Sequence, residues 1–189
     1  MTALYLGILL FAVPHLFSGL VPAGRTNLMA SMGEGAYKGV YSLLSLIGLI
    51  LMVYAYWVTR GSGDMLYVPS GAMRHATMGL ATLGMICISA FHGKSHIRLW
   101  LQNPFSIGIA LWSLGHLLSV GKTAAVWIWA TFLVIAIIDI AVSMARGKKP
   151  SFEPRWRSDI IAVIVGLILT ALLVTLFHPY VLGVYPLQG

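Results

Sequence analysis

Two histidines lie inside long apolar segments of this sequence. His15 occurs in LLFAVPHLFSG (9–19) and His116 in ALWSLGHLLSVGK (110–122). Burying an imidazole ring in hydrocarbon is costly unless its nitrogens find partners. Three arrangements satisfy such rings: an interhelical hydrogen bond to a hydroxyl or a backbone carbonyl, axial ligation of a haem iron, or a place in a proton relay. The residues themselves leave all three open.

The surroundings of both histidines leave room for a close neighbour. Pro14 removes one helix hydrogen bond directly before His15, which kinks the segment and opens space beside the ring. Small residues flank His116 and let another helix or a flat ring approach the backbone: Ser113, Gly115, Ser119 and Gly121. Both features suit a cofactor slot and ordinary helix packing equally well.

Other side chains with chemical potential favour structural roles. His92 and His96 have the i, i+4 spacing of a helical metal pair, but Gly93 lies between them and no third ligand is nearby in the sequence, so we expect an interfacial role. Asp139 is an intramembrane carboxylate, for which we favour a structural role near the cytoplasmic surface. Cys87 is the single cysteine and predicts neither a disulfide nor a cysteine metal site.

The elements that must position these residues are membrane helices. The chain has 189 residues, of which 59% are hydrophobic and 9% charged, and its mean hydropathy is +0.89. Such a chain has too little polar surface for a water-soluble globule. A membrane span needs about 20 apolar residues, and six segments qualify: 2–21, 39–58, 74–92, 104–120, 123–144 and 159–177. We therefore predict an all-α polytopic bundle of about six transmembrane helices, with residues 1–189 forming a single domain.

The basic residues predict how this bundle is oriented. Nine fall in the first, third and fifth loops: Arg25, Lys38, Lys94, Arg98, Arg146, Lys148, Lys149, Arg155 and Arg157. Three fall in the second and fourth loops: Arg60, Arg74 and Lys122. Because loops rich in Lys and Arg stay in the cytoplasm, both termini are expected in the periplasm. The net charge is +7, and the basic loop RGKKPSFEPRWR (146–157) is expected to contact anionic lipid headgroups of the bilayer, with no nucleic-acid partner.

Three segments in order carry a resemblance to a known family. They are PHLFSGLVPAGRTNLMASMGEGAYKGVYSLLSLIGLIL, NPFSIGIALWSLGHLLSVG and HPYVLGVYPL, and they extend from residue 14 to residue 187. With these segments the chain resembles the NnrU proteins, small bacterial membrane proteins associated with nitrite and nitric oxide reduction. The resemblance implies a multi-pass inner-membrane protein that supports denitrification, with respiratory or denitrification proteins of the membrane as partners.

This family is also similar to the plastid zeta-carotene isomerase, a haem-dependent membrane enzyme. That similarity implies a haem b with His15 and His116 as its iron ligands. It also implies Arg25 as the partner of a haem propionate and Tyr37 as a hydroxyl near the site. The alternative function that follows is a haem-dependent isomerase acting on a lipophilic polyene, so that a helper protein of respiration and an enzyme both stay open.

A more distant similarity concerns the segment NPFSIGIALWSLG, which resembles the RHPxYxG element of isoprenylcysteine-type membrane methyltransferases. Gln102 and Asn103 stand where that element has the Arg-His pair that handles the methyl donor. A membrane methyltransferase is therefore the third and least favoured function.

The depth of the predicted spans bears on which histidines can share one iron. His15 lies near the cytoplasmic end of its span and His116 near the opposite end of its own, about 15 Å apart in depth at 1.5 Å per residue. Two axial ligands of one metal need backbones within roughly 13 Å of each other. Residues at matching depth are His75 and His178 for His116, and His92 and His96 for His15.

Overall fold

The computed structural model describes residues 1–147 and 149–186, and their regular structure is helical. In chain order the helices are α1 (Thr2–Leu20), α2 (Pro22–Met32), α3 (Glu34–Thr59), α4 (Gly71–Ala90), α5 (His96–Leu101), α6 (Pro104–Ser119), α7 (Thr123–Ala145), α8 (Trp156–Leu172) and the π-helix η1 (Leu173–Leu182). Within the described ranges, β pairing is limited to an isolated bridge between Met65 and Lys122. The all-α prediction is confirmed.

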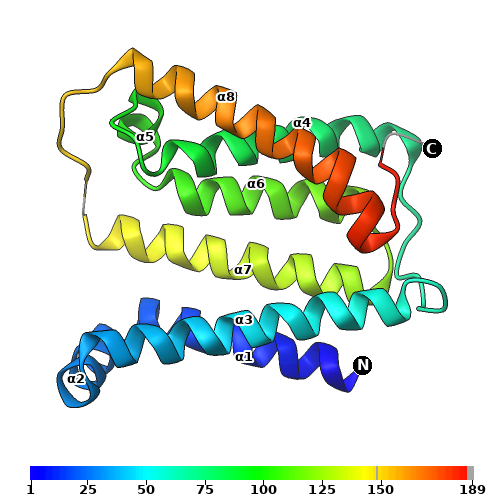
Figure 1. Cartoon of the computed structure of the whole chain (residues 1–189), viewed down its shortest axis with the longest axis horizontal. Coiled ribbons are helices and arrows are strands. Elements are labelled where there is room, and N and C mark those ends of the chain that lie inside the picture. The colour runs from blue at the N-terminus through cyan, green and yellow to red at the C-terminus, as the bar shows by residue number, and fades with distance from the viewer. Residues whose placement is uncertain (148, 187–189) are drawn as a thin grey trace.

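The long helices run side by side along the length of the molecule (Figure 1). Helix α1 packs on α3, and α4 packs on both α6 and α8. Helix α7 contacts α6 and α1, and so joins the two groups. The short helices α2 and α5 lie at the same end of the bundle (Figure 1).

Four of these helical segments are long and apolar enough to cross a membrane: Thr2–Leu20, Glu34–Thr59, Thr123–Ala145 and Trp156–Leu182. They support association with a lipid bilayer. The predicted count of about six is not confirmed. Helix α6 is apolar but has 16 residues, about 24 Å at 1.5 Å per residue, which is shorter than a hydrocarbon layer of about 30 Å. Helix α4 has 20 residues but carries Arg74 and His75 in its first turns.

Paired glycines set how closely the helices approach. A Cβ atom on Gly7 of α1 would lie 2.8 Å from the carbonyl oxygen of Gly48 in α3, and a Cβ on Gly108 of α6 would lie 2.5 Å from the carbonyl oxygen of Gly84 in α4. Both contacts therefore bring backbone against backbone. Helices in lipid gain little from the hydrophobic effect on association, so close packing at small residues supplies much of their attraction.

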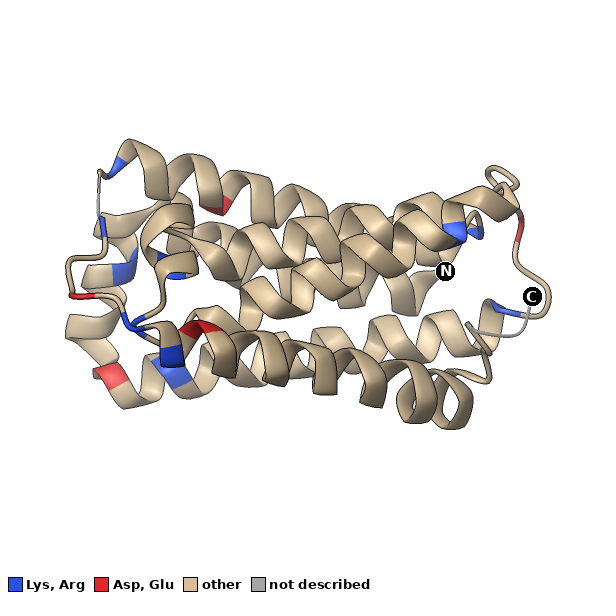
Figure 2. Cartoon of the chain, turned by 90° about the horizontal axis from the view of Figure 1, so that it is seen from above, with Lys and Arg blue, Asp and Glu red and all other residues tan. Residues whose placement is uncertain are grey.

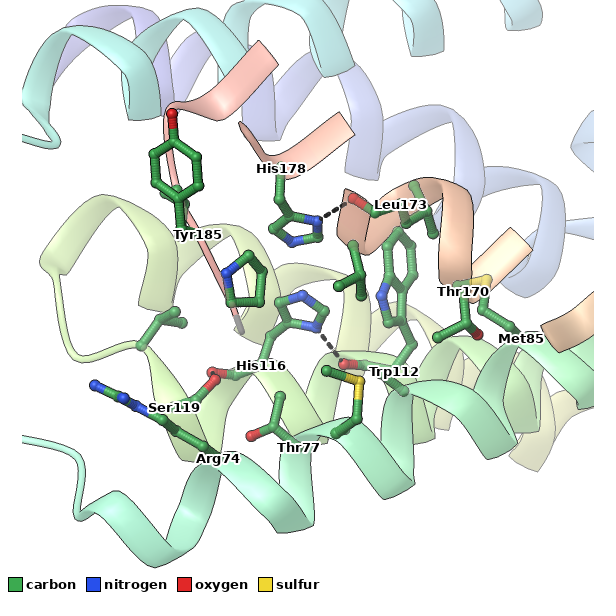
Figure 3. A pocket seen from close by; sticks show the side chains of 16 residues that line it. Arg74, Thr77, Met85, Trp112, His116, Ser119, Thr170, Leu173, His178 and Tyr185 are labelled. Atoms are coloured by element: carbon green, nitrogen blue, oxygen red, sulfur yellow. Dashed lines mark hydrogen bonds between the residues drawn. The ribbon is translucent and has the colours of Figure 1, made fainter. Parts of the chain in front are cut away.

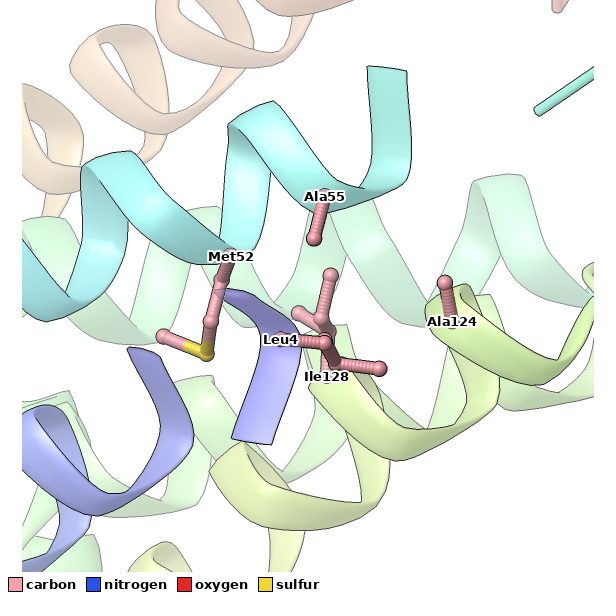
Figure 4. Close-up of a cluster of buried hydrophobic side chains, with 5 residues drawn as sticks. All are labelled: Leu4, Met52, Ala55, Ala124 and Ile128. Atoms are coloured by element: carbon pink, nitrogen blue, oxygen red, sulfur yellow. The ribbon is translucent and has the colours of Figure 1, made fainter. Parts of the chain in front are cut away.

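A small buried cluster fills the space where three helices meet (Figure 4). Its members are Leu4 of α1, Met52 and Ala55 of α3, and Ala124 and Ile128 of α7. Leu4 and Met52 are fully buried. This cluster fixes α7 against the α1–α3 pair and therefore sets where the next residues of α7 lie.

The turn between α5 and α6 explains the local sequence Gln102-Asn103-Pro104. Gln102 has a positive φ of 61° and ends α5. The Asn103 side chain caps α6 by accepting a hydrogen bond from the backbone N–H of Ser106, and Pro104 fits the first helical position because it has no N–H to satisfy. Asp139 of α7 accepts hydrogen bonds from the Asn103 amide at 2.9 Å and from the Ser106 hydroxyl. Its carboxylate thus ties α7 to the start of α6.

The charged residues are distributed unevenly over the two ends of the bundle. Figure 2 shows Lys and Arg gathered chiefly at the end that carries α2, α5 and the connection between α7 and α8. The other end holds the connections between α3 and α4 and between α6 and α7, and α1 begins and η1 ends there (Figure 1). The uneven charge predicted for the loops therefore coincides with the two ends of one helical bundle.

Candidate functional site

His116 lies in the last turn of α6, where its ring is held from two directions. The ring is 9% exposed, and its Nδ1–H donates a hydrogen bond of 2.8 Å to the carbonyl oxygen of Trp112 one turn earlier. Trp129 of α7 stacks on it with a centroid distance of 3.8 Å and an interplanar angle of 21°. With Nδ1 protonated, Nε2 keeps its lone pair, which is the form of imidazole that binds metals.

The connection between α3 and α4 fixes the end of α6 that carries His116. The Tyr67 hydroxyl donates to the carbonyl oxygen of Val120 at 2.8 Å and also contacts that of Leu117. Burial raises the pKa of this hydroxyl, so it stays protonated and remains a donor. A Cβ on Gly121 would overlap the carbonyl of Tyr67, which explains why a glycine follows the helix here.

Helix α4 holds the opposite side of the same turn. The Thr77 hydroxyl contacts the carbonyl oxygen of Gly115 at 2.7 Å. A Cβ on Gly115 would lie 3.1 Å from the carbonyl oxygen of Thr77, so the small residue beside His116 serves helix packing. These contacts leave the imidazole facing away from α4 with its position set by backbone groups.

His178 lies in η1, the π-helix that continues α8. Its Nδ1–H donates to the carbonyl oxygen of Leu173, five residues earlier, at 2.7 Å. Pro179 follows directly and has no N–H, so it cannot continue the hydrogen bonds of a regular α-helix. The π-helical spacing, in which bonds join residues five apart, matches the bond that the His178 ring makes.

The two rings face each other across a narrow gap. Their centroids are 6.1 Å apart and their planes differ by 15°. Figure 3 shows the second nitrogen of each ring turned toward the other ring, while the dashed bonds of the first nitrogens run outward to Trp112 and Leu173. Two lone pairs from different helices therefore converge on one point.

Two cavities border this histidine pair. One, of about 460 Å³, lies against α4, α6, α8 and η1. The other, of about 720 Å³, lies against α3, α6, α7 and η1 and is lined almost entirely by apolar and aromatic side chains. Trp112, His116, Leu173 and His178 line both cavities. The histidine pair therefore lies between the two cavities and lines both of them.

The donor set fits a planar metal complex with two axial imidazoles. Metal–nitrogen bonds of about 2 Å place the ring centroids of such a pair about 6 Å apart, close to the separation of His116 and His178. Within residues 1–147 and 149–186 no group of three or more His, Cys, Asp or Glu could hold a metal ion. His116 and His178 would therefore hold a metal only if a macrocycle such as haem supplied its remaining ligands.

His15 lies elsewhere, in a separate aromatic environment. Its Nδ1 bonds the carbonyl oxygen of Phe11 at 2.7 Å and its ring stacks on that of Phe11 at 4.2 Å. Ring contacts continue from Phe11 to Phe132 at 5.0 Å, from Phe132 to Trp129 at 5.8 Å, and from Trp129 to His116. The described linings of the two cavities do not include His15. The structure therefore connects His15 and His116 through three aromatic rings but does not place them face to face.

Arg25 and Tyr37 lie on the His15 side. Arg25 is exposed on α2, and the Tyr37 hydroxyl bonds that of Ser18 at 2.7 Å. Tyr41 links the two parts of this group, since its ring lies 5.1 Å from that of His15 and 6.5 Å from that of Tyr37. Neither Arg25 nor Tyr37 lines the two cavities, as far as the described residues outline them.

The remaining candidate histidines have other surroundings. His96 bonds the Asp159 carboxylate through Nδ1 at 2.8 Å and stacks on Trp156 at 4.1 Å. The same carboxylate accepts the backbone N–H groups of His96 and Ile97 and so holds the start of α5 against α8. His92 is exposed. The two histidines of the i, i+4 pair therefore have different surroundings, and their interfacial role stays a prediction.

Sequence reasoning did not place His178 or Trp129 in the site. The sixth predicted span ends at residue 177, one residue before His178, whereas the helix continues to Leu182. The signal that pointed to His178 was depth, because it placed His178 and His75 level with His116. The structure confirms His178 as a neighbour of His116, while His75 is exposed.

Comparison with known proteins gives one match. The sequence model of the family described as NnrU protein matches residues 3–186, which is nearly the whole chain. No curated protein and no solved structure matches the chain. The resemblance carried by the three segments is therefore confirmed at the level of the family, and the chain belongs to the NnrU family.

Proposed function

We propose that this NnrU-family membrane protein holds a haem b between His116 and His178 and supports the reduction of nitrite and nitric oxide in the bacterial inner membrane. The observation that carries the proposal is the pair of parallel imidazoles with centroids 6.1 Å apart. Backbone carbonyls bind both Nδ1 atoms and so leave both Nε2 atoms available to a metal. The haem would supply one-electron redox chemistry at this point.

Two protein ligands on one iron favour electron transfer over direct catalysis. With His116 and His178 both bound to its iron, the haem would offer no open site to nitrite or nitric oxide. The protein then acts as an electron carrier or helper for a reductase in the membrane. Co-purification of a reductase with the full chain would support this role, and the denitrification function is proposed from the family resemblance.

An absorption spectrum of the detergent-purified protein from haem-replete cells tests the haem. We expect an intense Soret band in the wild type. His116→Ala and His178→Ala each remove an axial nitrogen, so each should lower haem occupancy by more than about tenfold, since even outer-sphere changes cost 10- to 100-fold in metal sites. His15→Ala and His92→Ala are the matched histidine controls and should keep the band.

The outcomes separate the competing ligand sets. A stable wild-type protein without colour contradicts haem binding and returns the histidines to hydrogen bonding alone. A band that is lost in His15→Ala and His116→Ala but kept in His178→Ala supports the pair that the family resemblance implies. That result would also overturn the pairing proposed from ring geometry.

The apolar cavity favours a second candidate function, a haem-dependent isomerase of a lipophilic polyene. Such an enzyme needs an apolar space beside its haem and a route from the lipid. The cavity of about 720 Å³ borders both His116 and His178 and is lined by side chains of α3 such as Leu49, Ile50 and Val53. Turnover of a poly-cis polyene by the purified haem protein would favour the isomerase over the respiratory helper.

A further inference from the structure

The two cavities beside the histidine pair differ in charge. Among their described lining residues, Arg74 is the charged side chain, and it lines the smaller cavity. The larger cavity is lined by no Lys, Arg, Asp or Glu in the described part of the chain. The cavity on one side of the His116–His178 pair therefore has a cation at its edge, and the cavity on the other side is apolar.

This asymmetry matches the asymmetry of haem b. One edge of that macrocycle carries two carboxylates, and the opposite edge carries methyl and vinyl groups. We propose, on the basis of the haem site proposed above, that Arg74 binds the haem carboxylates in the smaller cavity and that the apolar edge occupies the larger one. The proposal replaces Arg25, the carboxylate partner that the family resemblance implies, with an arginine at the opposite end of the bundle.

The position of Arg74 suits a carboxylate partner. It lies in the first turn of α4 and is exposed, so it stands where the cavity meets water and where carboxylates remain partly solvated. The planar guanidinium binds carboxylates through two parallel hydrogen bonds. Figure 3 shows Arg74 beside Ser119 at the edge of the smaller cavity, with its guanidinium turned away from His116.

Of the other cations at this end, Arg60 has side-chain partners and Lys122 contributes its backbone to the fold. Arg60 donates to the carbonyl oxygen of Leu182 at 3.0 Å, and its guanidinium lies 4.8 Å from the ring centroid of Trp57. Lys122 takes part in the β-bridge with Met65 and precedes α7. The side chain of Arg74 makes no hydrogen bond or ion pair with residues 1–147 or 149–186.

The test compares two forms of the macrocycle. The full-length apoprotein in detergent is titrated with haem b and with haem b dimethyl ester, in which both carboxylates are blocked. Arg74→Gln should bind haem b about fivefold more weakly than the wild type, the upper range for an ion pair that is exposed to water. With the dimethyl ester the two proteins should bind equally. Arg74→Lys should recover part of the lost affinity, because it restores the charge without the planar fork.

Two matched variants control for charge and for position. Lys122→Gln removes a cation from the same end, and Arg25→Gln removes the cation at the opposite end. Both should bind haem b as the wild type does. The midpoint potential gives a second readout: loss of a positive charge beside the iron stabilises the oxidised form, so Arg74→Gln should lower the potential and Lys122→Gln should leave it unchanged.

Each outcome decides one claim. If Arg74→Gln weakens haem b and its dimethyl ester equally, Arg74 supports the fold and the proposal is wrong. If Arg25→Gln alone weakens haem b, the carboxylates face the other end of the bundle and the proposal is also wrong. If the wild type binds neither macrocycle, the proposed haem function fails before the question of orientation arises.

Discussion

Gly108 shows how the absence of one side chain determines a helix contact. A Cβ at this position would lie 2.5 Å from the carbonyl oxygen of Gly84 and 2.7 Å from the Ile88 side chain. Backbone cannot yield as a flexible side chain can, so α4 and α6 would have to move apart. Because α6 carries His116 and α4 carries Arg74, this contact also sets the distance across the smaller cavity.

We therefore expect Gly108→Ala to lower the free energy of unfolding by about 1–3 kcal/mol, the usual cost of an added methyl group in a well-packed site. Gly79→Ala is the matched control, since Gly79 also lies in a helix of this pair but a Cβ there meets nothing within 4 Å. Unfolding in mixed detergent micelles measures both. Equal midpoints for the two variants would contradict the close α4–α6 contact.

Three histidines illustrate what residue type predicts and what it leaves open. His15, His116 and His178 each bond a backbone carbonyl of their own helix through Nδ1. The sequence predicts that buried imidazoles need such partners, and they have them. It does not reveal which second nitrogens face each other, because that depends on how α6 and η1 approach in space. The pairing of His116 with His178 is therefore a tertiary property.

At the scale of the element, η1 is the segment whose geometry matters most to the site. Pro179 removes a backbone donor from the helix that presents His178. The chain responds with hydrogen bonds between residues five apart instead of four, which changes the direction in which each side chain leaves the helix axis. The bond from the His178 ring to the Leu173 carbonyl follows the same spacing.

Pro179→Ala should therefore disturb the site indirectly, by changing the geometry of η1. The alanine restores the missing N–H and allows α-helical spacing, which turns His178 away from His116. We expect haem occupancy to fall several-fold in the absorption spectrum. Leu176→Ala in the same helix is the control, because that side chain is half exposed and should leave the spectrum unchanged. An unaltered spectrum in Pro179→Ala would show that the π-helix does not orient His178.

Helix positions follow from the sequence more closely than helix ends do. The segments 104–120 and 123–144 correspond to α6 and α7 within one residue. The apolar residues of such a helix give way to polar residues where the chain meets water. The segment 159–177 underestimates the last helix, which continues through Pro179 as a π-helix to Leu182. The segment 39–58 begins late, because Glu34 and Lys38 form an i, i+4 ion pair in an exposed first turn of α3.

At the scale of the whole molecule, charge separates the two ends of the bundle. Basic residues gather at the α2 and α5 end (Figure 2), and α1 begins and η1 ends at the opposite end (Figure 1). The start of α1 and the end of η1 on one side agree with an even number of membrane crossings. The histidine pair lies toward the end with few cations, since His116 occupies the last turn of α6 and Arg74 the first turn of α4.

Reporter fusions test the orientation that this charge predicts. Loops rich in Lys and Arg remain in the cytoplasm, so fusions within 147–157 should report the cytoplasm and a fusion after residue 189 the periplasm. A fusion within 61–70, between α3 and α4, should also report the periplasm. The reverse pattern would contradict both the orientation and the periplasmic position of Arg74.

The place of η1 in the chain has a consequence for how the protein is made. Synthesis delivers α6 and its imidazole well before η1 emerges, because α7 and α8 come between them in the sequence. Until η1 packs against the bundle, both cavities lack two of their lining residues, Leu173 and His178. The site therefore stays open to the lipid during insertion and is closed by the last helix. The His116–His178 pair forms only when the bundle is complete.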